Sequence, residues 1–279
     1  MKKRLMRAAP IAQLKDDLMH LSTMWPSLNP DDYPYEELRE IARKINDLTV
    51  ESRNAALLRR DFFANASHEL KTPVTAIKGS AELLRADVPL EESQQRELLQ
   101  RIEAEAERLH NLINDIIMIN RLESGEPAGE KEPVNLDEIV RACVDELRGK
   151  IQQNRLRVDL DLEAVSLLAN RKNIYELLGN LIVNAVNYTP PGGRVEMHLR
   201  MGAQGVIFSI RNDGEPIPPG HQARMFERFY RLDAGRSKSV GGTGLGLAIV
   251  KHAVESHGGT IRLESDERVG VLFTVMLPI

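Results

Sequence analysis

His68 is the residue whose neighbours point most directly to covalent chemistry. It lies in the segment 67–73, which reads Ser-His-Glu-Leu-Lys-Thr-Pro. A neutral imidazole is a nucleophile near neutral pH, and an adjacent carboxylate can hold its tautomer or take its proton. A lone surface histidine beside a Thr-Pro step is more often without a chemical role. The chemistry therefore depends on a second site that could supply a substrate.

Two asparagines in the C-terminal half are the first sign of such a site. Asn180 and Asn184 are four residues apart in a run of helical period, so they share one face of a helix whose other face is apolar. Asparagine is a mediocre helix former, and its side-chain oxygen can be a hard ligand for Mg²⁺ carrying nucleotide phosphates. The alternative is a solvated helix face with two inert amides.

Glycines gather in two further segments. Asp213-Gly214 ends a strand in a turn, and residues 241–246 (Gly-Gly-Thr-Gly-Leu-Gly) open a helix. Glycine lets the backbone approach phosphate, and free amides at a helix N-terminus attract anions. A flexible hinge would explain the glycine loop equally well. The chain holds four such elements in one order: the paired asparagines, the Asp-Gly turn, residues 226–231 (Phe-Glu-Arg-Phe-Tyr-Arg) and the glycine loop. Their combination is harder to explain by packing.

A long amphipathic helix over about residues 35–85 must position His68. His68 falls half a turn from Ile77 and should face solvent, while Pro73 removes the donor for the Glu69 carbonyl and should kink the helix. The apolar residues that repeat at steps of three and four are Leu58, Phe62, Ala66, Leu70, Val74, Ile77, Ala81 and Leu84.

A second helix follows the break at residues 87–90. Its apolar residues alternate in steps of three and four, as in a coiled coil: Leu99, Ile102, Ala106, Leu109, Ile113 and Ile116. Two such helices form an antiparallel hairpin that cannot cover its own apolar stripe. We therefore expect a homodimer with a four-helix bundle, the alternative being a monomeric hairpin packed on the other domain.

The pattern changes to strands and helices beyond a linker at residues 124–129. The expected strands are 156–162, 195–199, 206–210, 260–263 and 271–277, and the expected helices are about 137–150, 171–188 and 244–257. Helices that cover one face of a sheet give a two-layer α/β sandwich.

Composition and charge limit the classes of protein to which the chain can belong. The chain has 279 residues, 42% hydrophobic and 28% charged, which suits two globular domains. A net charge of −4 with dispersed basic residues disfavours nucleic-acid binding. The single cysteine, Cys143, indicates a reducing compartment and is expected to be a buried structural thiol. The basic residues among 1–7 are either the cytoplasmic edge of a removed membrane span or a solvated charge run.

Together, these segments resemble the cytoplasmic part of a two-component sensor histidine kinase. Residues 67–73 are similar to the H box, 180–188 to the N box, Asp213-Gly214 to the first glycine box, 226–231 to the F box and 242–246 to the second glycine box. The resemblance implies a dimerisation and histidine phosphotransfer domain at 51–124 and an ATP-binding domain of the Bergerat (GHKL) fold at 130–279. Residues 1–50 resemble, more weakly, a membrane-proximal linker of the HAMP type.

The family also implies a role for each matched residue. His68 would take the γ-phosphoryl group of ATP and pass it to an aspartate of a response regulator, with Glu69 as base or orienting group. Thr72 would position a water that dephosphorylates the regulator. Asn184 would coordinate Mg²⁺ and Asp213 would bind the adenine amino group. The remaining ATP-site residues would be Asn180, Tyr188, Gly214, Ile217, Arg228, Arg231, Gly242, Thr243, Gly244, Leu245, Gly246 and Thr274, of which Tyr188, Ile217 and Thr274 would help form the adenine pocket. Residues 216–241 would form a lid.

Two departures from the family pattern stand out. Asn187 replaces a frequent lysine or arginine that contacts phosphate, so that cation is missing or comes from the lid. Pro216 replaces a glycine and should stiffen the hinge of the lid.

Two other functions are alternatives to the kinase. An ATP-driven conformational machine shares the nucleotide fold, but it has a glutamate where this chain has Asn180, and an amide cannot act as a general base. A pseudokinase scaffold would not need His68, Asn184 and Asp213 together. We expect the chain to be the cytoplasmic portion of a bacterial inner-membrane sensor, joined to the membrane only through a segment absent from it.

Overall fold

The computed structural model describes residues 11–18, 27–86, 89–123, 130–232 and 243–279. The chain divides into two compact units, residues 1–67 and 68–279, which are described separately. None of the helices within the described ranges carries the long apolar stretch that a membrane-spanning helix needs.

The first unit is organised around Tyr33. Residues 11–18 are helical, a 3₁₀ helix η1 covers Pro30–Asp32, and the long helix α2 begins at Glu36. The ring of Tyr33 is 1% exposed, and its hydroxyl donates to Asp17 Oδ2 at 2.7 Å. Burial and that carboxylate raise the pKa of Tyr33 to about 12. Leu14, Leu28 and Ala42 belong to the same buried apolar cluster as Tyr33.

Helix α2 runs from Glu36 to Arg85, which confirms the long helix expected over residues 35–85. It continues through Pro73 without interruption. The hydroxyls of Thr72 and Thr75 donate to carbonyls one turn earlier, those of His68 at 3.3 Å and Lys71 at 2.8 Å. Such bonds back to the helix are common for threonine within helices.

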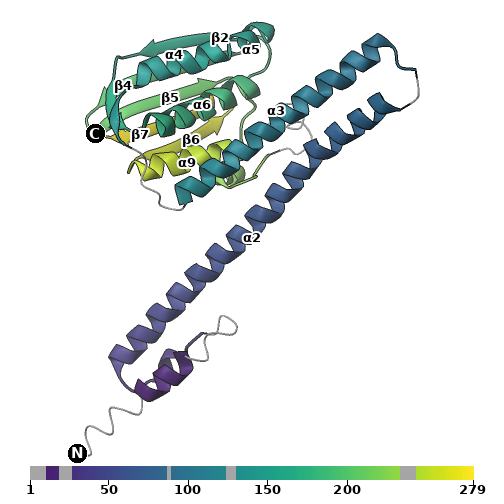
Figure 1. Cartoon of the computed structure of the whole chain (residues 1–279). Coiled ribbons are helices and arrows are strands. Elements are labelled where there is room, and N and C mark those ends of the chain that lie inside the picture. Colours follow the sequence, from purple (N-terminus) through teal and green to yellow (C-terminus); the bar gives the residue numbers. More distant parts are fainter. Residues whose placement is uncertain (1–10, 19–26, 87–88, 124–129, 233–242) are drawn as a thin grey trace, which may run out of the picture. The chain divides into compact units, whose positions relative to one another are not determined.

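Helix α3 (Glu92–Glu123) returns beside the part of α2 that follows Ser67, so the predicted antiparallel hairpin is present (Figure 1). The hairpin keeps large apolar side chains exposed on both helices. The exposed fraction is 49% for Val74, 56% for Leu83 and Leu99, 43% for Ile113 and 46% for Ile117. A single copy of the hairpin therefore leaves an apolar face uncovered. The predicted linker at residues 124–129 lies outside the described residues.

A mixed sheet forms one layer of the C-terminal domain. Its strand order is β2 (Arg157–Leu162), β4 (Arg194–Gly202), β5 (Gly205–Asn212), β7 (Gly270–Pro278) and β6 (Thr260–Asp266). Strand β2 is parallel to β4, and the other neighbours are antiparallel. All five predicted strands are confirmed. A further small sheet of β1 (Glu132–Asn135) and β3 (Ser166–Ala169) was not predicted, because strands of four residues show too little alternation.

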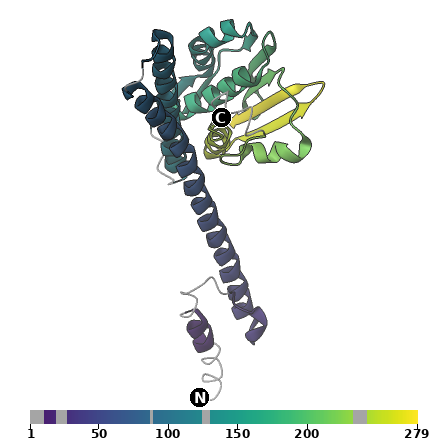
Figure 2. The ribbon, with the colours of Figure 1, turned by 90° about the vertical axis from the view of Figure 1, so that its right-hand side faces the viewer.

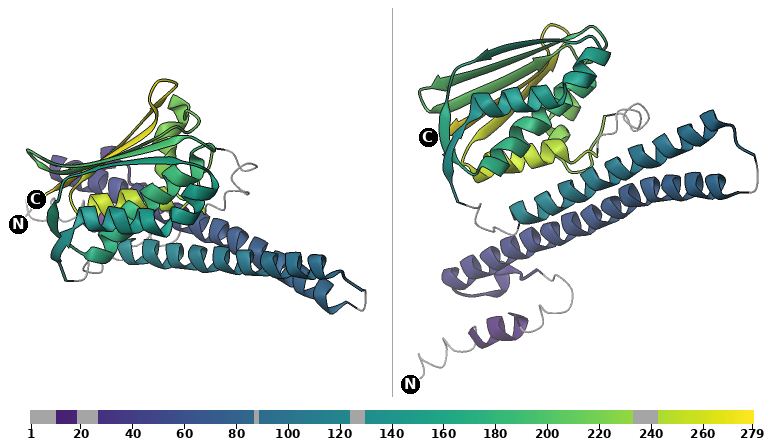
Figure 3. Two further views of the ribbon diagram at one scale, coloured as in Figure 1. Left: turned by 90° about the horizontal axis from the view of Figure 1, so that it is seen from above. Right: turned by 45° about the horizontal axis from the view of Figure 1, so that its top comes forward.

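Helices cover one face of this sheet (Figure 1, Figure 2, Figure 3). They are α4 (Leu136–Glu146), α6 (Arg171–Tyr188) and α9 (Gly246–Ser256), while the short α5 (Arg148–Gln153) follows α4 after Leu147. The predicted helix at 137–150 is thus two helices. The short α7 (Pro219–Gln222) and 3₁₀ helix η2 (Ala223–Phe226) lie in the predicted lid.

The core lies between the sheet and these helices. Alternate residues of β5 and β7 are buried, and the buried row packs with the apolar side of α6 and α9. The predicted two-layer α/β sandwich is therefore confirmed. Cys143 is 3% exposed in this core, and burial raises the pKa of its thiol to about 11. It is the buried thiol that the sequence predicted.

Candidate functional site

His68 is exposed on α2, as its position on the helix predicted. The next residue, Glu69, is half-buried, and its Oε2 lies 3.3 Å from Nη2 of Arg108 on α3. The Arg108 side chain is 16% exposed and also lies 4.0 Å from Glu105. The carboxylate beside the histidine is therefore held by a cation from the other helix of the hairpin. Nothing in the sequence pattern had marked Arg108.

Asn180 and Asn184 form an asparagine stripe on α6, and this stripe meets the start of α9 at Asn180. The Asn180 amide donates to the Glu176 carbonyl at 2.8 Å, which leaves its oxygen facing Gly246. A Cβ on Gly246 would lie 2.7 Å from Asn180 Oδ1, closer than real Cβ atoms approach. A Cβ at this position would displace the Asn180 side chain or the start of α9. Asn184 follows one turn later and is half-buried.

Gly244 joins the predicted F box to the second glycine box. Its φ is +73°, and a Cβ there would lie 2.9 Å from the Phe229 Cα. Its carbonyl accepts from the Phe229 backbone amide at 2.8 Å. Leu245, which follows, is fully buried. Gly242, also predicted for this loop, lies outside the described residues.

Thr243 connects the glycine loop to the hairpin. Its hydroxyl donates to Asp115 Oδ2 on α3 at 2.7 Å and accepts from the Leu245 backbone amide at 3.2 Å. Burial raises the pKa of Asp115 to about 6. Sequence reasoning missed Asp115, because the two residues are 128 positions apart.

The turn after β5 packs on the end of α6. A Cβ on Gly214 would lie 3.2 Å from the Tyr188 carbonyl oxygen, so Gly214 permits this approach. The Asp213 carboxylate accepts from Arg211 Nη2 at 3.1 Å and from the Arg194 backbone amide at 3.0 Å. These two donors hold the Asp213 carboxylate beside Arg211, which also pairs with Glu196 at 2.7 Å outside the buried rows of β4 and β5. Ile217, predicted for the same pocket, is buried, and its backbone amide donates to the Ser265 hydroxyl at 2.9 Å.

The two predicted phosphate-binding arginines are partly buried. Nε and Nη2 of Arg231 are buried without a hydrogen-bond partner among the described residues. Buried guanidinium donors without an acceptor are costly, so this arrangement suits an anion. Burial lowers the pKa of Arg228 below its ordinary value.

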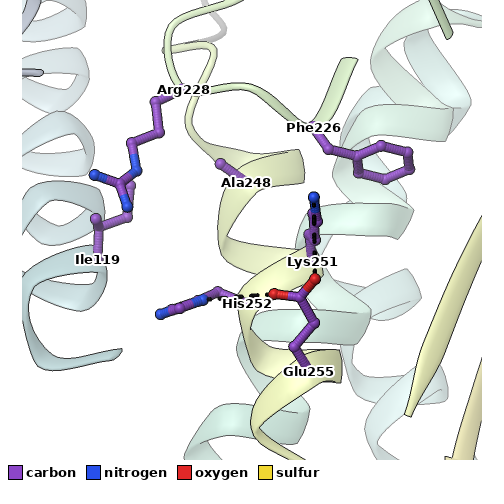
Figure 4. A pocket seen from close by; sticks show the side chains of 7 residues that line it. All are labelled: Ile119, Phe226, Arg228, Ala248, Lys251, His252 and Glu255. Atoms are coloured by element: carbon purple, nitrogen blue, oxygen red, sulfur yellow. Dashed lines mark ion pairs between the residues drawn. The ribbon is translucent and has the colours of Figure 1, made fainter. Parts of the chain in front are cut away.

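Arg228 also lines a hollow of about 180 Å³ on the outer side of α9 (Figure 4). Its other lining residues are Ile119, Phe226, Ala248, Lys251, His252 and Glu255. Ligand pockets are usually roughly 300–1,000 Å³. This hollow includes neither Asn184 nor Asp213, so it is not the predicted nucleotide site.

Thr274, predicted for the adenine pocket, lies on the face of the sheet away from the helices. The side chains of Val271, Phe273 and Val275 on β7 are buried on the helix-covered face, and Thr274 belongs to the opposite row. Its partners across the sheet are Ser209 and Arg262. Val271 instead approaches Gly214, since its Cγ2 would be 3.4 Å from a Cβ there. The assignment of Thr274 to the adenine pocket is therefore corrected in favour of Val271.

Asn187, the first departure from the family pattern, has a cationic partner. Lys150 Nζ on α5 donates to Asn187 Oδ1 at 2.5 Å. Asn187 lies one turn after Asn184 on α6, so the ammonium lies near the asparagine stripe.

Two family models match the chain. The model described as "His Kinase A (phospho-acceptor) domain" matches residues 58–125, which hold the hairpin and His68. The model described as "Histidine kinase-, DNA gyrase B-, and HSP90-like ATPase" matches residues 169–279, which hold α6, α9 and both glycine segments.

Two named relatives support the same family. The chain is 35% identical over 78% of its length to the phosphate regulon sensor protein PhoR of Pseudomonas aeruginosa, of which it covers 49%. It is 36% identical over 84% of its length to the sensor-like histidine kinase SenX3 of Mycolicibacterium smegmatis, of which it covers 61%. The chain thus spans about half to three-fifths of these two relatives.

Among solved structures, the chain is similar to the histidine kinase ThkA in complex with the response regulator protein TrrA. The TM-score is 0.63 at 25% identity, and the match covers 81% of this chain and 63% of that one. Both domains, their order along the chain and the named relatives agree, and the chain therefore belongs to the two-component sensor histidine kinases.

Proposed function

We propose that the C-terminal domain binds ATP with Mg²⁺ and that the γ-phosphoryl group is transferred to a ring nitrogen of His68. The phosphohistidine then passes the group to an aspartate of a response regulator. The observation that carries this proposal is that Gly246 packs against the Asn180 side chain, which brings the backbone amides at the start of α9 beside the asparagines of α6.

The residues present fit a magnesium nucleotide. Asn184 would hold Mg²⁺ through its side-chain oxygen, and the oriented carboxylate of Asp213 would accept from the adenine amino group. Tyr188, Ile217 and Val271 would line the adenine. The amides of residues 243–246 and the two arginines, Arg228 and Arg231, would contact the phosphates. The unpartnered donors of Arg231 support that assignment.

The transfer requires one bond to form and one to break. A ring nitrogen of His68 attacks the γ-phosphorus, the bond from that phosphorus to the bridging oxygen breaks, and ADP leaves. Glu69 takes or steadies the imidazole proton, and the Arg108 ion pair holds that carboxylate in position. Mg²⁺, when bound, supplies charge neutralisation for the phosphates.

The same arrangement supports three further proposals. The uncovered apolar face of the hairpin supports a homodimer through a four-helix bundle. The likeness to ThkA, which was solved with a response regulator, supports such a regulator as the partner. Thr72, one turn after His68, is proposed to position a water for dephosphorylating the regulator.

The domain boundaries are also proposals. Residues 51–124 would be the dimerisation and phosphotransfer domain and residues 130–279 the ATP-binding domain. Residues 1–50 would be a linker of the HAMP type that connects them to a sensing part at the bacterial inner membrane. The folding of residues 11–18 and 27–35 around Tyr33 supports a structured linker.

ATP hydrolysis as the main activity is disfavoured by Asn180. In the ATPases of this fold a glutamate at that position activates water, and the Asn180 amide cannot accept a proton. Its amide nitrogen is moreover engaged by the Glu176 carbonyl.

Incubation with γ-labelled ATP and Mg²⁺ tests the proposal. Acid-labile, base-stable label on the wild-type chain that is lost in His68→Ala is expected. Released phosphate without protein-bound label would identify an ATPase, and neither signal would identify a scaffold without chemistry.

A further inference from the structure

Lys150 is held at the end of the asparagine stripe. It lies on the short helix α5, and its ammonium donates to the Asn187 side-chain oxygen at 2.5 Å across 37 positions of sequence. Among the residues that the structure describes, no carboxylate forms an ion pair with Lys150. Its charge therefore has a neutral amide as its partner, and two of its three N–H donors stay available for an anion.

The position of Asn187 decides where this charge lies. Asn180, Asn184 and Asn187 follow one another at steps of four and three, so they share one face of α6. The first of them meets the glycine loop at Gly246. The residue after the last, Tyr188, meets Gly214 through its carbonyl. The ammonium of Lys150 thus lies at the C-terminal end of the α6 face that Gly246 approaches, one residue before the point where Gly214 meets the helix end.

We propose that Lys150 is a nucleotide-binding residue that supplies, from α5, the cation that Asn187 does not. Its ammonium, positioned by the Asn187 oxygen, contacts the phosphate chain of the nucleotide. This inference rests on the proposed function, since it concerns the same ATP site.

A purely structural tether between α5 and α6 is the competing explanation of the same hydrogen bond. The two accounts differ in what the substitution changes. A tether affects the stability of the domain and all ligands alike, whereas a phosphate contact affects ligands in proportion to their charge.

The experiment is calorimetric titration of the full chain with ATP, ADP and adenosine in the presence of Mg²⁺. Lys150→Ala is expected to weaken ATP binding by about tenfold, a typical effect of one charge-assisted contact, and to leave adenosine binding unchanged. Lys172→Ala is the matched control, because Lys172 is exposed on the first turn of α6, at the other end of the helix.

A double variant that moves the cation from α5 to α6 gives a second test. In the double variant with Lys150→Ala and Asn187→Lys, the cation stands on α6 itself, and ATP affinity is expected to return to within about threefold of wild type. Equal ATP affinities of Lys150→Ala and Lys172→Ala would overturn the inference. So would an equal loss for ATP and adenosine, which would indicate a tether. Failure of the wild-type chain to bind ATP would overturn the proposed function, and this inference with it.

Discussion

At the scale of single residues, the proposed site depends on close approaches that only small or oriented side chains allow. Gly246 lies against Asn180, Gly244 against Phe229 and Gly214 against the end of α6. Each approach joins two separate motifs of the chain. Gly246 therefore brings the loop that we propose to bind phosphate to the asparagines of α6.

Replacing Gly246 with alanine tests the closest of these approaches. The new Cβ would lie 2.7 Å from Asn180 Oδ1, so either the loop or the asparagine must move. We expect ATP affinity to fall about tenfold, roughly the loss of one or two backbone contacts to phosphate, as measured by titration. Gly79→Ala is the control, since nothing lies within 4 Å of its Cβ position. Equal affinities in the two variants would contradict the role of Gly246.

Asp115 predicts a dependence of stability on pH. Its pKa is about 6 in the folded chain against 3.8 for an unperturbed carboxyl, so the folded state binds the proton more tightly. The free energy of unfolding should therefore rise as pH falls from about 6 to 4. Above pH 6 the buried charge of Asp115 should lower that free energy by up to about 3 kcal/mol. Asp115→Asn should melt at a higher temperature than wild type at pH 7.5, and this advantage should shrink near pH 4.5. An advantage that is independent of pH would contradict this assignment.

At the scale of elements, the sequence predicted more of the fold than of the site. The predictions of α2 and of the five main strands were correct, because the spacing of apolar residues in a long segment reflects which face of the element is buried. The strands β1 and β3 were missed because they are short. Thr274 was misassigned because strands alternate, and an odd shift along β7 turns the side chain to the other face. The partners Arg108 and Asp115 left no local signal, since only folding brings them to Glu69 and Thr243.

The ion pair between the two hairpin helices gives a prediction at this scale. Arg108→Ala would leave Glu69 and Glu105 together without their cation, which should lower the free energy of unfolding by about 1–3 kcal/mol and slow labelling of His68. Denaturant melts and initial labelling rates measure the two effects. Arg96→Ala, which breaks the exposed pair with Glu92, should cost no more than about 0.5 kcal/mol. Equal costs in the two variants would mean that the burial of Arg108 has no effect.

At the scale of the whole molecule, the apolar face of the hairpin indicates an assembly of two copies. Leu99 and Ile113 lie on the predicted seam and are 56% and 43% exposed in a single chain. A partner hairpin would bury these side chains and close the bundle. The homodimer is therefore the assembly that this surface favours.

Leu99→Glu should convert the dimer into monomers. A charge placed in the seam would have to be desolvated in the bundle, so the dissociation constant should rise by at least about a hundredfold in analytical ultracentrifugation. Val183→Glu, on an exposed position of α6 outside the hairpin, should leave the dimer intact. A dimer that tolerates the Leu99 variant would place the interface elsewhere.

The most direct measurement is to locate the phosphoryl group by mass spectrometry after incubation with ATP and Mg²⁺, with digestion kept at alkaline pH. The account predicts a phosphorylated peptide that contains His68, absent from His68→Ala and strongly reduced in Asn184→Ala. A phosphoryl group on any other residue, or an unmodified His68 in a chain that binds ATP, would contradict it.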